Sequence, residues 1–128
     1  MSTRRVSSGS PYEAMLGFCR ALRIGDRVEV AGTAPIWPDG SVHPDPEEQA
    51  RRCLEIILAA LAELGSGPEH VVRTRMYITS GGVAESVGRA HAKVFGAEPP
   101  VSTIVVVAGL LDPRWRVEIE AEAVLGDP

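Results

Sequence analysis

The sequence predicts an α+β fold, in which a mixed β-sheet carries two helices packed on one of its faces, in the order β-β-α-β-α-β-β. Three observations predict it. Residues 117–124 alternate strictly between apolar and charged side chains, which is typical of a strand with one buried face. Residues 46–64 repeat apolar side chains every three or four positions, which is typical of an amphipathic helix. Two short strands precede that helix, and a further strand and helix follow it. With 128 residues, the whole chain, 1–128, is expected to form one domain.

The N-terminal third is expected to contain a lead-in, a hairpin and a loop. Residues 1–16 are rich in serine, glycine and arginine, and we expect an extended lead-in there. Residues 17–23 and 27–32 read as two short strands joined at a Gly-Asp turn. Residues 34–46 hold four prolines and a glycine and are therefore expected to form a loop. Trp37 in this loop could line a ligand site or fix the loop to the body of the protein, and we favour the second role.

The first helix has a clear start and a clear apolar face. Asp45 is a good N-cap, Pro46 suits the first helical position, and Glu48 completes an arrangement like a capping box. The apolar face consists of Ala50, Cys53, Leu54, Ile57, Leu58, Leu61 and Leu64. Cys53 on this face is expected to be a buried, reduced thiol. The helix should end at the glycines of residues 65–68.

The second half is expected to supply one helix and three strands. In the strand at residues 70–79, Arg73, Arg75 and Tyr77 share a face. The two arginines could bind an anion or pair with glutamates of a neighbouring strand, and we favour the pairing, because carboxylates are costly to bury alone. A helix should follow to about Phe95, with His91 on its apolar face as a hydrogen-bonded core or interface residue.

The chain closes with the remaining two strands. The β-branched run at residues 104–107 predicts a strand buried on both faces. In the last strand, Glu118, Glu120 and Glu122 share one face. This face could simply be solvated, or Glu118 at the strand entrance could look into a pocket or a subunit interface.

Composition and motifs exclude several classes of function. The net charge of −4 argues against general nucleic-acid binding. No apolar run is long enough for a transmembrane helix, and the N-terminus lacks the apolar core of a secretory signal, so we expect a cytoplasmic protein and no membrane partner. The scattered histidines and cysteines make a metal site improbable. The chain has no phosphate-binding glycine motif, and we expect no cofactor.

Three stretches resemble the C-terminal signature of a known family. They are Pro-Val-Ser-Thr at 100–103, Ala-x-Leu at 108–110 and Val-Glu-Ile at 117–119. Upstream matches at 17–21, 28–35 and 71–77 extend the likeness over nearly the whole chain. The sequence thereby resembles the Rid family, whose best-known members are enamine and imine deaminases.

The resemblance implies a compact fold like that of small chorismate mutases, assembled as a homotrimer with small-molecule clefts between subunits. It also implies that the sheet face opposite the helices packs toward the trimer interior, which accounts for the three glutamates better than a solvated face does. In the family, an arginine of the cleft holds the substrate carboxylate and a glutamate at the position of Glu118 can orient water. Glu118, Ser102 and Thr103 are therefore the candidate catalytic residues. The candidate substrate-binding residues are Phe18, Gly32, Thr33, Arg75 and Trp115.

Departures from the family pattern leave the activity open. Ser102 stands where the deaminases carry the arginine that holds the carboxylate, and Phe18 stands where many members have tyrosine. One hypothesis is a hydrolase whose substrate is altered and could be neutral. A second is a non-catalytic ligand-binding or regulatory trimer. A third is the RNA cleavage ascribed to some relatives, which the acidic charge opposes.

Overall fold

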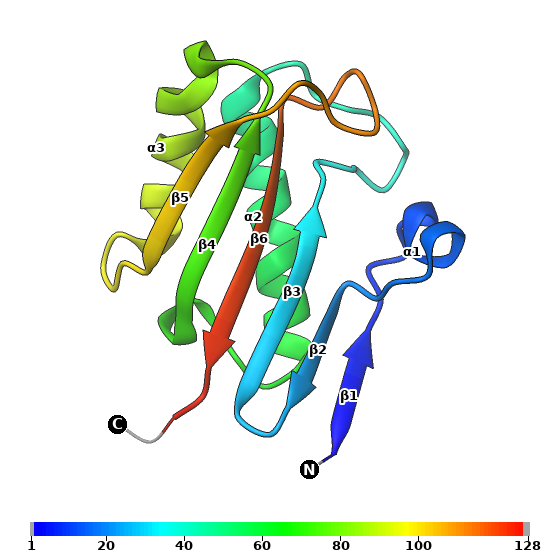
Figure 1. Ribbon diagram of the computed structural model, residues 1–128, viewed down its shortest axis with the longest axis vertical. Helices are drawn as coiled ribbons and strands as arrows, with labels where there is room; N and C mark the ends of the chain where they lie inside the picture. The colour runs from blue at the N-terminus through cyan, green and yellow to red at the C-terminus, as the bar shows by residue number, and fades with distance from the viewer. Residues whose placement is uncertain (1, 127–128) are drawn as a thin grey trace.

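The computed structural model of the protein describes residues 2–126. It contains one six-stranded β-sheet. Its strands lie in the order β1-β2-β3-β6-β4-β5 (Figure 1). β4 and β5 run parallel and all other neighbours are antiparallel, so the sheet is mixed, as the sequence predicts. The strands are β1 (Thr3–Val6), β2 (Ala21–Ile24), β3 (Arg27–Thr33), β4 (Val71–Ile78), β5 (Val101–Val106) and β6 (Val117–Val124).

Two long helices cover one face of this sheet. They are α2 (Pro46–Glu63) and α3 (Ala84–Phe95), and both lie behind the strands in Figure 1. Two short 3-10 turns, η1 (Pro68–His70) and η2 (Gly81–Val83), introduce β4 and α3. The Asp45 side chain accepts a hydrogen bond from the Glu48 backbone N–H, which confirms the predicted N-cap of α2. The α+β fold with both helices on one sheet face is confirmed.

The core lies between this helical layer and the sheet. The apolar stripe of α2 is buried there, and Cys53 on it is a free, buried cysteine as predicted. From β6 the alternate residues are buried in the same core, namely Val117, Ile119, Ala121 and Ala123. The intervening glutamates remain only half-buried.

The N-terminal segment differs from the extended lead-in expected over residues 1–16. It forms β1, which pairs with β2, and the six-residue helix α1 (Pro11–Leu16). Ser10 caps the start of α1, and Gly17 ends it with a φ of 78°, a left-handed conformation that glycine adopts at little cost. Gly17, expected in the first hairpin strand, is thus a helix cap. A helix this short shows too few turns for its apolar period to be recognised in a sequence.

Arg75 makes ion pairs across the sheet between β4 and β6, as the sequence predicts, whereas Arg73 makes none among the described residues. The Arg75 guanidinium lies 3.3 Å from Glu120 and 3.0 Å from Glu122. The Tyr77 hydroxyl donates a hydrogen bond to Glu120. Arg75 therefore neutralises part of the glutamate face within the same protomer.

Strand β5 contradicts the expectation of a strand buried on both faces. It is the last strand of the sheet, and all six of its residues are exposed. Val101 is 58% exposed and Val106 is 61% exposed. An apolar edge strand of this kind is open to pairing or packing with another chain. The β-branched run therefore predicts the strand correctly but not its exposure in the protomer.

Candidate functional site

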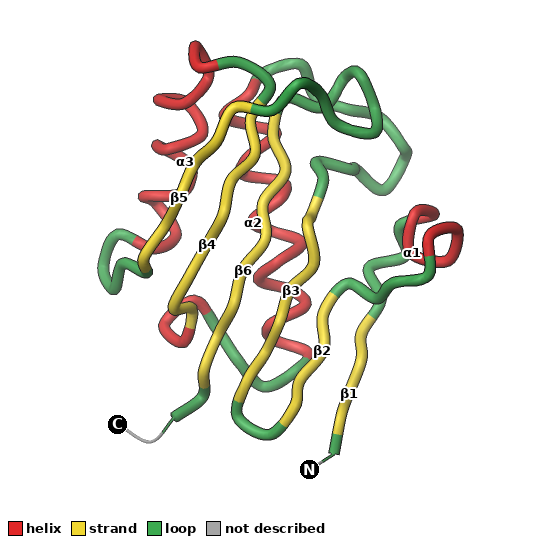
Figure 2. The backbone as a smooth tube through the Cα atoms, viewed as in Figure 1, coloured by secondary structure: helices red, strands yellow, loops and turns green. Residues whose placement is uncertain are grey.

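A cavity of about 880 Å³ opens at the end of the sheet where β3 stops and β6 begins. The loops that follow β3 and β5 approach each other here, with α1 beside them (Figure 2). A volume of this size lies within the range of small-molecule sites. Its wall combines the α1 segment, the end of β3 and the loop after it, one face of α2, and residues 111–118.

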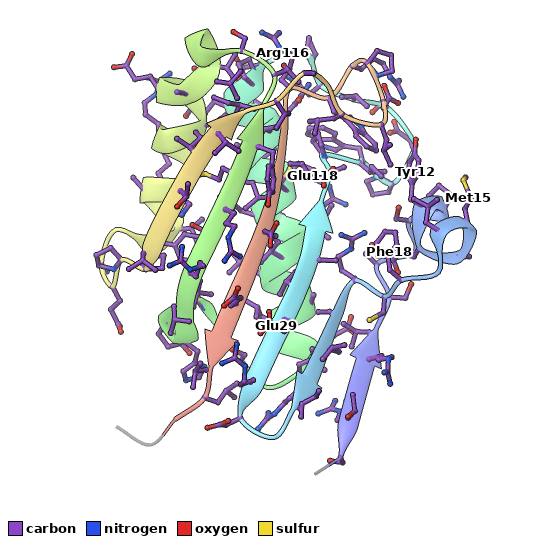
Figure 3. All side chains as sticks on the ribbon, viewed as in Figure 1. Tyr12, Met15, Phe18, Glu29, Arg116 and Glu118 are labelled. Atoms are coloured by element: carbon purple, nitrogen blue, oxygen red, sulfur yellow. The ribbon has the colours of Figure 1, made fainter. Side chains whose placement is uncertain are left out.

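Glu118, the first glutamate of β6, lines this cavity (Figure 3). Burial raises the pKa of its carboxyl group, the charge of Glu120 adds to this effect, and the charge of Arg20 opposes it. Gly32 on β3 leaves room for the carboxylate, because a Cβ atom at this glycine would collide with a Glu118 oxygen. No hydrogen bond from the described part of the chain holds the Glu118 side chain. The cavity thus contains one carboxyl group free to act on a ligand.

Arg20 is buried beside this group but already bound. Its Nε lies 3.3 Å from the Glu13 carboxylate, and both side chains are at most 6% exposed. Its Nη1 donates to the Thr33 hydroxyl at 3.0 Å and to the Gly32 carbonyl at 2.5 Å. The guanidinium also lies over the ring of Phe18, 5.4 Å from its centroid. Arg20 therefore fixes α1 and the end of β3 to each other and is compensated by Glu13.

The other two arginines in the cavity wall are also paired with acids. Arg114 makes two hydrogen bonds to Asp112, of 3.1 and 2.8 Å. Arg52 donates to the Ile36 carbonyl at 2.8 Å and lies 3.4 Å from Glu55. A ligand carboxylate would have to compete with an existing partner at each of these three guanidinium groups.

Aromatic side chains are concentrated around the cavity. The chain has two tryptophans, two tyrosines and two phenylalanines. Four of these six line the cavity, and they are Tyr12, Phe18, Trp37 and Trp115. The rings of Tyr12 and Trp115 meet edge to face with centroids 5.3 Å apart. Trp37 lines the cavity, which is the role that the sequence analysis considered but did not favour for it.

Trp115 also carries a polar atom without a partner. The residue is 4% exposed, and its Nε1–H finds no hydrogen-bond acceptor among residues 2–126. A buried donor of this kind is costly unless something accepts from it. The Nε1 atom is itself buried, so the cavity is lined by other atoms of Trp115.

The structure brings five of the eight predicted site residues to the cavity, namely Phe18, Gly32, Thr33, Trp115 and Glu118. Ser102, Thr103 and Arg75 do not line it. Ser102 accepts a hydrogen bond of 2.7 Å from the Thr74 hydroxyl. Thr103 lies on exposed β5, opposite Arg75, which binds the glutamates of β6.

His91 takes part in the hydrogen bonding around Ser102. Its Nε2 lies 2.8 Å from the Thr74 hydroxyl, which in turn donates to Ser102. Burial lowers the pKa of His91. The prediction of a hydrogen-bonded His91 is confirmed, and its partners hold the end of α3 to β4 and β5.

Tyr12 and the Glu13–Arg20 pair were not among the predicted site residues. The sequence analysis placed Tyr12 and Glu13 in an extended segment, where nothing assigns a direction to their side chains. Glu13 and Arg20 are seven residues apart with a helix end between them, so no helical or strand spacing indicates their contact. The Ser-Pro start of α1 was the available signal, since serine is a good N-cap and proline suits the first helical position.

Neither a metal centre nor a membrane span is found in the part of the chain that the structure describes. No group of three or more His, Cys, Asp or Glu side chains within it is placed to hold a metal ion. None of its helices combines the length and the apolar character needed to cross a membrane.

Comparisons with known proteins agree on one family. The family model described as Endoribonuclease L-PSP matches residues 9–125. An uncharacterised protein of Streptomyces coelicolor is 43% identical over 126 residues, which is 98% of this chain and 94% of that one. A RutC family protein of Pyrococcus abyssi is 31% identical and covers 84% of both chains.

A solved structure supports the same assignment. The crystal structure of Rv2704 from Mycobacterium tuberculosis, described as a member of the YjgF/YER057c/UK114 family, superposes with a TM-score of 0.88. The two chains are 41% identical in sequence, and the match covers 96% of this chain and 99% of the Mycobacterium tuberculosis chain. With its six-stranded mixed sheet and two covering helices, the chain belongs to the Rid family, also known as YjgF/YER057c/UK114.

Proposed function

We propose that the protein hydrolyses the C=N bond of a small imine, or of the imine tautomer of an enamine, with Glu118 as the general base. The observation that carries this proposal is the free carboxyl group of Glu118 in a cavity of small-molecule size. In the reaction, water adds to the imine carbon, the C–N bond breaks, and the products are a carbonyl compound and ammonia. Glu118 takes the proton from the attacking water and returns it to the leaving nitrogen.

The raised pKa of Glu118 suits this role. A carboxylate with a pKa above its usual value is a stronger base. Trp115 and the aromatic rings of the wall would shield the reacting imine from bulk water. No metal or cofactor is part of the proposal.

The proposal includes a homotrimer with the cleft completed between subunits. The exposed apolar strand β5 supports an interface there, because Val101 and Val106 are each more than half exposed in the protomer. In this arrangement, Ser102 and Thr103 of one subunit would face the cavity of its neighbour. The Thr103 hydroxyl could then contact the substrate beside Glu118, whereas the Ser102 hydroxyl already accepts a hydrogen bond from Thr74.

A non-catalytic ligand-binding trimer is the alternative function. The pairing of Arg20, Arg52 and Arg114 with acidic partners favours it, because none of them is free to anchor a carboxylate as the cleft arginine does in the deaminases. The cavity would then bind a small molecule without turning it over.

Ammonia release from freshly generated imines distinguishes these functions. Anionic 2-imino acids and neutral imines are offered to the wild type, to Glu118→Ala and to Ser102→Arg. We expect the wild type to release ammonia from neutral imines and Glu118→Ala to lose this activity. We expect Ser102→Arg to gain activity on the anionic substrates, because it restores a bidentate carboxylate partner.

Other results would change or refute the proposed hydrolase function. If the wild type is silent and Ser102→Arg is active, the cleft is competent but lacks its anchor. If all three proteins are silent, the hydrolase is refuted and the ligand-binding alternative remains. Ammonia release that persists in Glu118→Ala would contradict the role given to Glu118.

A further inference from the structure

We propose that residues 10–16, which include α1, form a flap at the cavity that swings about Gly9 and Gly17, and that the Glu13–Arg20 ion pair is the latch that holds it closed. This inference goes beyond the proposed function, because it concerns how a wall of the cavity moves. It applies equally to an enzyme and to a protein that only binds a ligand.

The flap is one wall of the cavity. Four of its residues line the cavity, and they are Ser10, Pro11, Tyr12 and Leu16. In the closed position the Tyr12 ring meets the Trp115 ring edge to face, with centroids 5.3 Å apart. An outward swing would break this contact and open the cavity on the side of α1.

Little apolar surface attaches the flap to the rest of the protein. Figure 1 shows α1 beside the sheet, away from α2 and α3, and α1 makes few contacts with the strands and the two long helices. Its side chains Met15 and Leu16 are 69% and 57% exposed, and Figure 3 shows Met15 pointing away from the body of the protein. Of the six residues of α1, all of which the structure describes, only the charged Glu13 is buried. A segment with so few buried apolar contacts opens at a low cost in free energy.

A glycine stands at each end of the flap. Gly9 has a φ of 82° and Gly17 a φ of 78°, a left-handed conformation that glycine adopts at little cost. A Cβ atom at either glycine would meet no heavy atom within 4 Å apart from its chain neighbours. Close packing therefore does not fix the backbone at these two positions, and both can absorb the rotation of a hinge.

Glu13 holds the flap closed through polar contacts. Its carboxylate accepts hydrogen bonds from the Ser8 backbone N–H at 3.2 Å and from the Ser8 hydroxyl, and it lies 3.3 Å from the Arg20 Nε. Ser8 and Arg20 both lie outside the two glycines, so each of these contacts crosses a hinge. Arg20 is anchored in turn to the Gly32 carbonyl and the Thr33 hydroxyl at the end of β3.

The burial of this ion pair favours the closed position. The side chains of Glu13 and Arg20 are at most 6% exposed, and an outward swing of Glu13 would leave the charge of Arg20 without its acid. Burial alone would raise the pKa of Glu13, but hydrogen bonds from Ser8 and Ser7 and the charge of Arg20 lower it overall. The closed flap therefore contains the charged carboxylate.

Fluorine NMR of the full-length protein measures the closed and open populations. The label is a trifluoromethyl group on a cysteine introduced by Met15→Cys, at an exposed position of the flap. Cys19→Ser removes the other accessible thiol, and the buried Cys53 remains. We expect one main signal from the closed flap and a minor second signal from the open flap.

Variants in this labelled background test the latch and the hinge separately. Glu13→Gln removes the charge of the latch and should raise the open fraction about tenfold or more. Gly17→Ala leaves the latch intact, but alanine disfavours the left-handed backbone of the closed flap, so the same second signal should grow.

Each variant has a matched control. Glu29→Gln removes a carboxylate from the exposed ion pair with Arg27 on the same sheet. Gly40→Ala introduces alanine at a φ of 81°, also with no heavy atom within 4 Å, in the loop after β3. Neither control should change the open fraction.

Growth of the same second signal in Glu13→Gln and Gly17→Ala, at a chemical shift different from that of the urea-unfolded protein, would support the flap. The proposal is overturned if Glu13→Gln gives the spectrum of the parent protein, or if the controls raise the second signal equally. It is also overturned if the new signal coincides with that of the unfolded chain, because α1 would then unfold instead of swinging. If Glu13→Gln does not fold, Gly17→Ala decides alone, and an unchanged spectrum refutes the hinge.

Discussion

The carboxyl group of Glu118 lies in surroundings that disfavour its charged form. Burial raises its pKa, the charge of Arg20 opposes this shift, and the charge of Glu120 adds a smaller repulsion. Gly32 allows this placement because it has no side chain. The position is therefore costly for the fold and useful for chemistry, which is common at functional sites.

A measurement of thermal stability tests the free-energy cost of the charged Glu118 side chain. Glu118→Gln should raise the melting temperature at pH 8, because it removes a charge that the folded protein disfavours. A carboxyl group whose pKa is raised in the folded state contributes stability that is present at low pH and is lost as the pH rises through that pKa. The difference between variant and wild type should therefore shrink as the pH falls to about 4.

The matched control for Glu118→Gln is Glu29→Gln, which removes an exposed carboxylate paired with Arg27. It should not raise the melting temperature at pH 8. A lower melting temperature for Glu118→Gln at pH 8 would mean that the charge of Glu118 is stabilised in the fold, in conflict with the raised pKa.

Among the elements, α2 and β6 could be predicted from sequence and β5 could only be half predicted. Capping and a wide apolar stripe indicate α2, and strict alternation indicates β6, because both patterns follow from burial within the protomer. The β-branched run of β5 indicates a strand correctly. It gives the wrong burial, because β-branched residues favour an edge strand as well as a central one. Helix α1 was missed because six residues are too few to show a helical period.

The exposed edge at β5 gives a prediction at the element scale. Val106→Lys should convert the proposed trimer to monomers, because a lysine on an edge strand opposes the approach of another chain. Sedimentation equilibrium measures the mass directly. Ile24→Lys serves as the control, since Ile24 is an exposed apolar residue of β2, far from β5 in the sheet. A trimer that survives Val106→Lys, or a monomeric wild type, would contradict the proposed interface.

At the scale of the whole molecule, the candidate site combines parts that the sequence keeps far apart. The wall of the cavity comes from residues near 10, 35, 55 and 115, which meet because β3 and β6 are neighbours. Resemblance to the Rid family predicts five residues of this wall from the sequence. The Arg52–Glu55 pair has the i, i+3 spacing of a helical ion pair, but the Glu13–Arg20 pair could not be predicted, because its residues lie on either side of a helix end. These pairs determine how much positive charge the cavity wall presents to a ligand.

Mixed trimers test how the protomers share the site. The double variant Ser102→Arg/Glu118→Gln should be inactive, and the wild type should release little ammonia from anionic 2-imino acids. Coexpressed, the two should form hybrid trimers in which some cavities combine Glu118 of one subunit with the arginine introduced at position 102 of its neighbour. Ammonia release from anionic 2-imino acids should appear in the mixture.

The mixture should exceed the summed activity of its separately purified components. If it does not, while the single variant Ser102→Arg is active, the two positions act within one protomer and the shared cleft is refuted.

The placement of both tryptophans on one cavity has a spectroscopic consequence. The chain has no tryptophan besides Trp37 and Trp115, so the indole emission of the entire protein arises at the wall of this site. Any molecule that enters the cavity changes the polarity or quenching around an emitting ring. The native protein can therefore report its own occupancy by fluorescence, without a label, and libraries of unlabelled metabolites can be screened against it directly.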